Sequence, residues 1–448
     1  MAAPLLITTL AEYQTRFWKE VGLALRAAGG DPVFLSFDDR STEMLRADGL
    51  TAISFSEERR GASEAEAEAA LGRTGLDNVN FWLGHERAVF HRRDTEAMRL
   101  KLAYSTLAAE RALARSGPGT IMVQELGGFL SNIGSYFAAR GQGVDNHFIE
   151  PSFFRGRFTF TPNSFGAPRF EQWEGELPAA CEAYLDQTVT AQAIVVPQKD
   201  RHHYRPALAK VANLGNAKRV VEKLVDKHVH GKVQEFGHIG LHVRQHARML
   251  ANARKLRGAY APLERVGRFV YYPFHVPGDV ALTLRAPEYL DQLALVDYLC
   301  RTVPDGVAVA VKEHPAMIGA IDAQRLLGLA RRYDNLAILD PSLNNYRVIA
   351  AAEAVVTVNS KSGAEAGLVG KPVVVLGDAF YRNAPFATPA TGLSDLADAL
   401  ARAGGGRADD EAVRRWFGGL WRGTHEGELY VTGVENVETF AAAMLQLG

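Results

Sequence analysis

The chain has 448 residues, of which 47% are hydrophobic and 23% charged, and its formal net charge at pH 7 is -1. This composition is sufficient for two ordinary domains with hydrophobic cores and excludes a disordered or fibrous protein. The balanced charge gives no overall attraction to nucleic acid, so any preference for anions must be local. The two cysteines, Cys181 and Cys300, lie far apart without the spacing of metal ligands, which fits a reducing compartment.

Membrane insertion is not expected from the sequence. No segment approaches the roughly 20 uninterrupted apolar residues that a membrane span requires. Residues 1–10 also lack the basic leader and apolar core of a signal peptide. We therefore expect a cytoplasmic protein that is at most peripheral at the inner membrane.

Strands and helices alternate in the apolar pattern of residues 1–176, which we predict to form the first domain. Alternation of this kind favours a doubly wound parallel sheet. The predicted strands are 5–9, 32–37, 120–123 and 147–150, and helices are predicted at 13–28, 96–116 and 132–140.

Residues 177–264 have a different character, because Lys, Arg and His dominate positions 199–257 and no strand pattern is present. We predict a basic helical insertion. His238, His242 and His246 recur at every fourth position and would share one helix face. They could form a metal cluster, but we favour a solvated basic face because no carboxylate or cysteine completes a ligand set. Alternatively, the 199–257 segment could bind an acidic acceptor or the anionic head groups of a membrane.

A second alternating pattern occupies residues 265–405, and residues 406–448 are predicted to form helices that pack back on the first domain. The expected fold class is therefore α/β, with two Rossmann-like domains facing a cleft and an inserted helical subdomain. In this architecture ligands bind at the carboxyl edge of a sheet.

Two strand-to-loop junctions in the second domain combine cations, hydroxyls and a helix start. The apolar run 307–311 predicts a buried strand that ends in Lys312, His314 and Pro315. A helix start leaves unpaired amide donors that suit a phosphate, so the two junctions together predict a nucleotide-phosphate site. The second junction follows the strand 355–358 and contains Ser360, Ser362, Gly363 and Glu365.

Each of these residues also has a structural interpretation. His314 beside a leaving phosphate can donate a hydrogen bond and stabilise the developing charge, although a histidine ending a strand can also bond to nearby carbonyls. Lys312 is two positions from His314 and should lie on the same sheet face, but it could instead form an internal salt bridge. Ser360 and Ser362 could cap the helix instead of binding phosphate, since both roles use the same groups. Glu365 is favoured in a first helical turn even without a ligand.

These paired motifs resemble the capsular polysaccharide biosynthesis family, which includes bacterial transferases of Kdo (3-deoxy-manno-octulosonic acid) that use CMP-Kdo. Residues 271–279 are similar to the family segment that precedes the His-Pro motif. Residues 148–158 are similar to the family loop that carries a catalytic acid. The resemblance implies a two-Rossmann architecture of the GT-B type. It assigns Glu150 as acid/base and Asp279 as the opposite carboxylate, which could be a covalent nucleophile. It also implies that Glu365 reaches the ribose, and His275 stands where these transferases usually carry glutamine.

A further acidic loop follows the strand 120–123. Glu125 and Gly127 resemble the acidic, glycine-containing loop that supplies the base in bacterial sialyltransferases, where glycine lets an acceptor sugar approach the backbone. Arg155 and Arg157 could bind the carboxylate of a 2-keto acid sugar or an anionic acceptor, but they could equally be surface strand residues.

The absent motifs narrow the function. No Gly-x-Gly-x-x-Gly follows the first strand and no P-loop occurs, which argues against nicotinamide dehydrogenases and P-loop NTPases. No convincing Asp-x-Asp loop is present, so we expect no metal and no cofactor. The resemblance favours a glycosyltransferase that moves a Kdo-like sugar from CMP-Kdo or a related donor onto a surface polysaccharide or glycolipid, with no nucleic-acid partner. The alternatives are a UDP-sugar transferase or epimerase of the same architecture, and a non-catalytic module for polysaccharide assembly or export.

Overall fold

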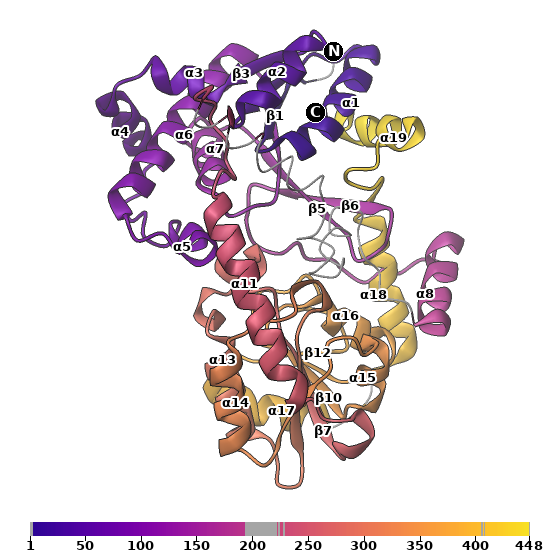
Figure 1. Ribbon diagram of the computed structural model, residues 1–448. Coiled ribbons are helices and arrows are strands. Elements are labelled where there is room, and N and C mark those ends of the chain that lie inside the picture. Colours follow the sequence, from indigo (N-terminus) through magenta and orange to yellow (C-terminus); the bar gives the residue numbers. More distant parts are fainter. Residues whose placement is uncertain are drawn as a thin grey trace.

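The computed structural model describes residues 3–192 and 229–447 except 405 and 407, together with 222, 225 and 226. It contains two Rossmann-like α/β domains, the first in the upper half of Figure 1 and the second in the lower half. Much of the basic segment 199–257 falls outside the described residues.

The first domain is built on a sheet with the strand order β13-β6-β5-β4-β1-β2-β3 in the described residues. Neighbours from β3 to β5 are parallel, whereas β6 and β13 complete one edge in antiparallel orientation. The strands are β1 (Leu5–Thr9), β2 (Pro32–Ser36), β3 (Thr51–Ser54), β4 (Ile121–Glu125), β5 (Asn146–Pro151), β6 (Arg157–Pro162) and β13 (His425–Glu426).

The helices of the first domain cover both faces of this sheet through apolar stripes. In α1, Phe17, Trp18, Val21 and Leu25 are buried at the three- and four-residue spacing of one helix face. The central strands β1 and β2 are buried along their whole length, as expected for parallel strands covered on both sides. The helices are α1 (Glu12–Ala27), α2 (Asp39–Ala47), α3 (Phe55–Arg60), α4 (Glu64–Arg73), α5 (Gly84–Phe90), α6 (Thr95–Ser116) and α7 (Leu130–Gly141).

The second domain contains a wholly parallel sheet with the described order β12-β11-β10-β7-β8-β9. The chain reverses direction across the sheet between β7 and β10, so the carboxyl ends of β10, β7 and β8 are neighbours. The strands are β7 (Phe269–Pro273), β8 (Ala308–Lys312), β9 (Leu336–Leu339), β10 (Ala354–Thr357), β11 (Val373–Val375) and β12 (Ala387–Pro389). The helices are α12 (Val280–Thr283), η4 (Pro287–Tyr289), α13 (Gln292–Thr302), η5 (Pro315–Met317), α14 (Ala323–Arg332), α15 (Asn345–Ala351), α16 (Lys361–Leu368), η6 (Leu393–Asp395) and α17 (Leu396–Gly404).

The C-terminal helices divide between the two domains. Helix α18 (Asp410–Arg422) packs on the second domain, because its apolar residues Trp416 and Phe417 belong to that core. The chain then returns to the first domain through β13 and α19 (Val434–Leu445). Helix α19 lies beside α1, and its Phe440 stacks on Phe158 with ring centroids 4.0 Å apart. The prediction that residues 406–448 pack back as a whole is therefore corrected for α18.

Residues 177–191 also lie elsewhere than predicted. They include α8 (Ala179–Ala191), which we had expected to begin the basic insertion. Instead, α8 packs beside α18, where Arg414 and Asp186 form an ion pair at 2.5 Å and the buried Cys181 belongs to the second core. The physical reason is the apolar face of α8, which matches that of α18.

Helix α11 (Ile239–Leu256), the long described helix of the predicted insertion, bridges the two domains (Figure 1). The segment before it is anchored to the first domain by Phe236, whose ring lies 4.8 Å from that of Phe129. Near its other end, Asn252 donates hydrogen bonds of 3.0 Å to the carbonyls of Gly319 and Ile321 in the second domain. Helix α11 is followed by η2 (Arg257–Ala259) and η3 (Leu263–Arg265).

Two predictions about this segment can be compared with the described residues. His242 and His246 lie on α11 and His238 is its N-cap residue, and within the described part of the chain no three His, Cys, Asp or Glu side chains are grouped as metal ligands. In the same part of the chain, no helix is both long and apolar enough to cross a bilayer.

Candidate functional site

The carboxyl edge of the second sheet brings the predicted junctions together. Because β7 lies between β8 and β10, the segments that follow these strands meet at the point where the strand order reverses. The backbone N–H of Asn359, after β10, donates to Nε2 of His275, after β7, at 3.2 Å. Burial, and then the neighbouring His314, lower the pKa of His275 to about 4, so its ring is neutral at pH 7 and carries its hydrogen on Nδ1.

His314 ends the segment after β8 with a defined ring orientation. Its Nδ1 accepts a hydrogen bond of 3.3 Å from the backbone N–H of Ala316, so the neutral ring carries its hydrogen on Nε2. Pro315 begins the short helix η5, a position where the missing proline N–H costs nothing. The His-Pro pair therefore sets the direction in which the imidazole can donate.

The start of α16 supplies the hydroxyls and amides of the second junction. Ser360 is the N-cap residue, and its side chain accepts from the N–H of Ser362 at 3.2 Å. The hydroxyl of Ser362 accepts from Nδ2 of Asn345 at 2.9 Å. At Gly363, a Cβ atom would lie 2.3 Å from the hydroxyl oxygen of Tyr381, so only glycine fits. Helix capping and close packing thus account for these residues structurally, while the helix start remains oriented toward the sheet edge.

A lysine and a glutamate are buried at the same edge. Lys312 is 3% exposed, and burial lowers its pKa to about 8 against the opposing charges of Glu365 and Asp340. Glu365 is 9% exposed, and burial raises its pKa, although it accepts a hydrogen bond of 2.6 Å from Asn345. Among the described residues, no protein group hydrogen-bonds to the ammonium of Lys312, and its nitrogen is not one of the fully enclosed polar atoms, so it opens to the edge. An anionic ligand would supply the missing partner.

The candidate carboxylates Glu150 and Asp279 come from different domains. Glu150, at the end of β5, accepts from both terminal nitrogens of Arg285 in the second domain, at 3.1 and 2.8 Å. Asp279 is exposed and caps α12, where its side chain accepts from the N–H of Ala281 at 2.9 Å. Glu150 is thus held across the domain interface, while Asp279 lies at the start of the segment that reaches across it.

The carboxylate of Glu125 is held by hydrogen bonds within the protein. Its carboxylate oxygens accept from the indole N–H of Trp18 at 2.8 Å and from the hydroxyl of Tyr430 at 2.6 Å. These bonds tie α1 to the C-terminal segment. A Cβ atom on Gly127 would lie 2.8 Å from Oδ1 of Asn132, so glycine is required there by packing.

The two arginines proposed for substrate binding differ in their surroundings. Arg157 donates to the side chain and the carbonyl of Thr424, each at 2.7 Å, and its guanidinium lies 4.2 Å from the ring centroid of Trp421. These contacts hold β13 against β6, so the guanidinium already has partners within the protein, and its binding of substrate stays a prediction. Arg155 is exposed, and its backbone N–H donates to the hydroxyl of Tyr184 at 2.9 Å.

Residues that sequence reasoning missed are Arg285, Asn345 and Asn359. Asn359 lies in the second junction but had no predicted role, and Arg285 and Asn345 belong to no recognisable motif. Each is identified by its contacts: Arg285 with Glu150, Asn345 with Ser362 and Glu365, and Asn359 with His275.

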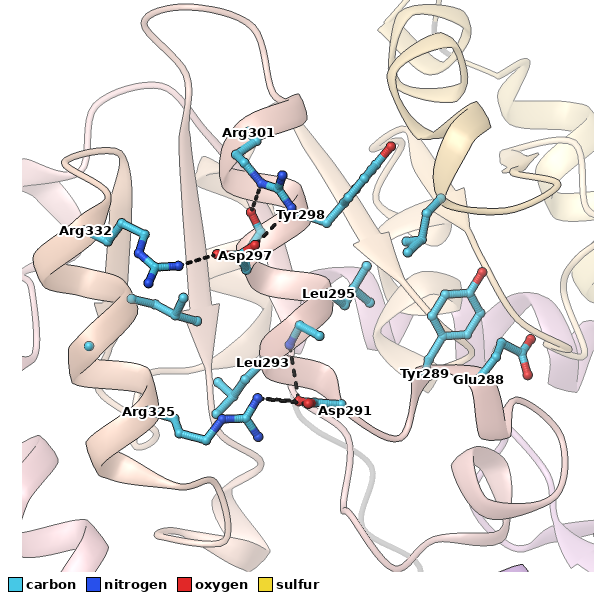
Figure 2. A pocket seen from close by; sticks show the side chains of 14 residues that line it. Glu288, Tyr289, Asp291, Leu293, Leu295, Asp297, Tyr298, Arg301, Arg325 and Arg332 are labelled. Carbon is cyan, nitrogen blue, oxygen red and sulfur yellow. Dashed lines mark hydrogen bonds and ion pairs between the residues drawn. The ribbon is translucent and has the colours of Figure 1, made fainter.

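A surface hollow of about 660 Å³ is lined by residues of η4, α13, α14 and η6 (Figure 2). Arg325 pairs with Asp291 at 2.8 Å, while Arg301 and Arg332 both pair with Asp297, at 2.9 and 3.3 Å. These three arginines are thus already paired, unlike Lys312 at the sheet edge.

Comparisons with known proteins place the chain in a family. It is 31% identical over 171 residues to Protein FixF of Sinorhizobium fredii (strain NBRC 101917 / NGR234). The alignment covers 38% of this chain and 40% of Protein FixF, so it spans less than half the length of that relative. It aligns with KpsC, beta Kdo 2,7 transferase, of Thermosulfurimonas dismutans at 15% identity and a TM-score of 0.38, covering 75% of this chain and 89% of the other. It also aligns with an α,α-trehalose 6-phosphate synthase of Burkholderia multivorans at 12% identity and a TM-score of 0.36, covering 100% and 99% of the chains. The family model described as "Capsule polysaccharide biosynthesis protein" matches residues 134–393, more than half of the chain, so the protein belongs to this family.

Proposed function

We propose that this protein is a glycosyltransferase that moves a Kdo-like acidic sugar from a CMP-activated donor onto a surface polysaccharide or glycolipid. The observation that carries the proposal is the meeting of His314, Lys312 and the start of α16 at one sheet edge, where the buried ammonium lacks a hydrogen-bond partner among the described residues. Membership of the capsule polysaccharide family supports a polysaccharide or glycolipid acceptor.

The proposed chemistry breaks the bond between the anomeric carbon and the phosphate oxygen, and the electron pair leaves with the cytidylate. His314 would donate through Nε2–H, while Lys312 and the amides at the start of α16 would balance the phosphate charge. In a retaining route, the carboxylate of Asp279 attacks the anomeric carbon and Glu150 acts as acid/base in the two displacements. In an inverting route, Glu150 takes the proton of the acceptor hydroxyl in a single displacement.

Nucleotide binding tests the first step. CMP should raise the thermal midpoint in proportion to its occupancy, and more than UMP or UDP does. His314→Ala should reduce both CMP protection and turnover, while added EDTA should leave turnover unchanged. A preference for UDP would favour the UDP-sugar transferase or epimerase, and absence of any nucleotide binding would favour a non-catalytic assembly module.

Carboxamide variants test the second step. Glu150→Gln and Asp279→Asn should keep CMP protection but lower the rate of transfer by about 10²- to 10⁴-fold, as measured by mass spectrometry of the product over time. Asp322→Asn is the matched control, because Asp322 is likewise an N-cap residue, accepting from two backbone N–H groups at the start of α14. Full activity in either test variant would remove its residue from catalysis. A sugar trapped on Asp279 would establish the retaining route.

We also propose that the protein works at the cytoplasmic face of the inner membrane, with the basic segment 199–257 as a peripheral contact. The composition of that segment supports binding to anionic lipid. Co-sedimentation with phosphatidylglycerol vesicles, but not with phosphatidylcholine vesicles, should be observed and should weaken with salt.

A further inference from the structure

The segment that contains α12 is one part of the second domain that contacts the first. Thr283 donates its hydroxyl hydrogen to the carbonyl of Asp279 at 3.1 Å, and its oxygen therefore accepts from Nδ1 of His85 on α5, at 2.7 Å. A Cβ atom on Gly278 would lie 3.1 Å from the side chain of Val89, also on α5. The segment is thus in close contact with the first domain before it reaches Arg285.

Arg285 places its guanidinium inside the first domain. It donates to both oxygens of Glu150, at 3.1 and 2.8 Å, to the carbonyl of Phe165 at 2.8 Å and to that of Gly166 at 3.1 Å. The Arg285 side chain is 9% exposed and that of Glu150 is 20% exposed. Burial acts to lower the pKa of Arg285, but the charge and hydrogen bonds of Glu150 outweigh it and raise this pKa. The two carbonyls fix the plane of the guanidinium, which then orients the carboxylate through paired bonds.

A second contact joins the same end of β5 to the nucleotide-side edge. Lys361, the first residue of α16, donates from Nζ to the carbonyl of Ser152 at 2.8 Å. Ser152 lies two positions after Glu150. Glu150 therefore lies between the segment capped by Asp279 and the helix start that contains Ser360.

We infer that Arg285 is a positioning residue for Glu150: it reaches across the domain interface and orients the Glu150 carboxylate relative to the sugar-leaving site of the second domain. The inference rests on the proposed transferase function. Its consequence is that Glu150 takes up its working orientation only when the two domains are docked. Other contacts between the second domain and the rest of the chain, such as the ion pair of Arg169 with Asp378, do not involve Glu150.

The test compares the same substitution at two arginines. Arg285→Lys keeps the charge but loses the planar fork, so turnover (kcat) should fall by about 10- to 100-fold, the range expected from a small misplacement of a reacting group. The KM for the donor and the thermal protection by CMP should stay near the wild-type values. Arg169→Lys, the matched control, should keep wild-type kcat.

A double-mutant comparison separates positioning from a purely structural role. If Arg285 acts through Glu150, then Arg285→Lys should cause no further loss of kcat in a Glu150→Gln background. Arg285→Gln is the second variant should the lysine variant fail to fold, and added guanidinium should restore part of its turnover.

Four results distinguish the possible failures. Wild-type kcat in Arg285→Lys, or an equal loss of kcat with and without Glu150→Gln, would overturn the positioning role. An equal loss of kcat in Arg169→Lys would reduce Arg285 to one of several domain contacts and would also overturn it. If the wild-type protein itself neither binds CMP nor transfers a sugar, the proposed function has failed instead.

Discussion

Replacing Lys312 by methionine should make the protein more stable at neutral pH while weakening nucleotide binding. The side chain is 3% exposed, and burial lowers its pKa from the ordinary value of 10.5 to about 8. This difference corresponds to about 3 kcal/mol of destabilisation when the lysine is charged. Methionine fills a similar volume without the charge. Because Glu365 loses a favourable neighbour in the variant, we expect a net gain of about 1–3 kcal/mol.

The pH dependence gives the sign of this effect. A lysine whose folded pKa lies below its unfolded pKa destabilises the protein fully below the lower value, and the loss is recovered as the pH rises through the interval between them. The stability difference between Lys312→Met and wild type should therefore be largest below pH 8 and vanish near pH 10.5. Urea unfolding of both proteins at pH 7 and at pH 10 measures this difference.

Lys371→Met is the control for this experiment. Lys371 lies in the same domain and donates to the carbonyl of Ala352 at 2.8 Å, so its removal should bring no gain in stability and should leave CMP protection intact. A loss of stability in Lys312→Met at pH 7 would refute the reasoning, since it would mean that the ammonium already has a stabilising partner. Unchanged CMP protection would remove Lys312 from the nucleotide site.

Two further substitutions test the structural roles of site residues. Gly363→Ala places a methyl group 2.3 Å from the Tyr381 hydroxyl oxygen. It should lower the free energy of unfolding by about 1–3 kcal/mol and weaken CMP protection. The control is Gly328→Ala in α14, where the nearest atom is 3.9 Å away and the substitution should stabilise the protein by up to about 1 kcal/mol. Glu125→Gln leaves one of its two partners less well bonded and should cost about 1–2 kcal/mol in chemical denaturation without loss of transfer. The opposite pattern, full stability with no transfer, would return Glu125 to catalysis.

The sequence alone predicted the alternation of strands and helices in both domains and the meeting of two strand-to-loop junctions in the second. Patterns repeated every two or about every four residues are local, so β1, α1 and β2 could be recognised from a few neighbouring positions. The same applies to the two junctions, since a strand that ends in Lys312 and His314 and a helix that begins at Ser360 are visible without long-range information. Their meeting at one edge followed from the rule that parallel strands share a carboxyl edge.

Only the tertiary structure decided which charged side chains are bonded within the protein. Glu125 is 107 positions from Trp18 and 305 from Tyr430, and Glu150 is 135 positions from Arg285. Contacts at such separations leave no periodic pattern, so a carboxylate with structural partners looks the same in the sequence as a catalytic one. The division of the C-terminal helices between domains was hidden for the same reason: each has an apolar face, and the matching core is assembled only when the chain folds.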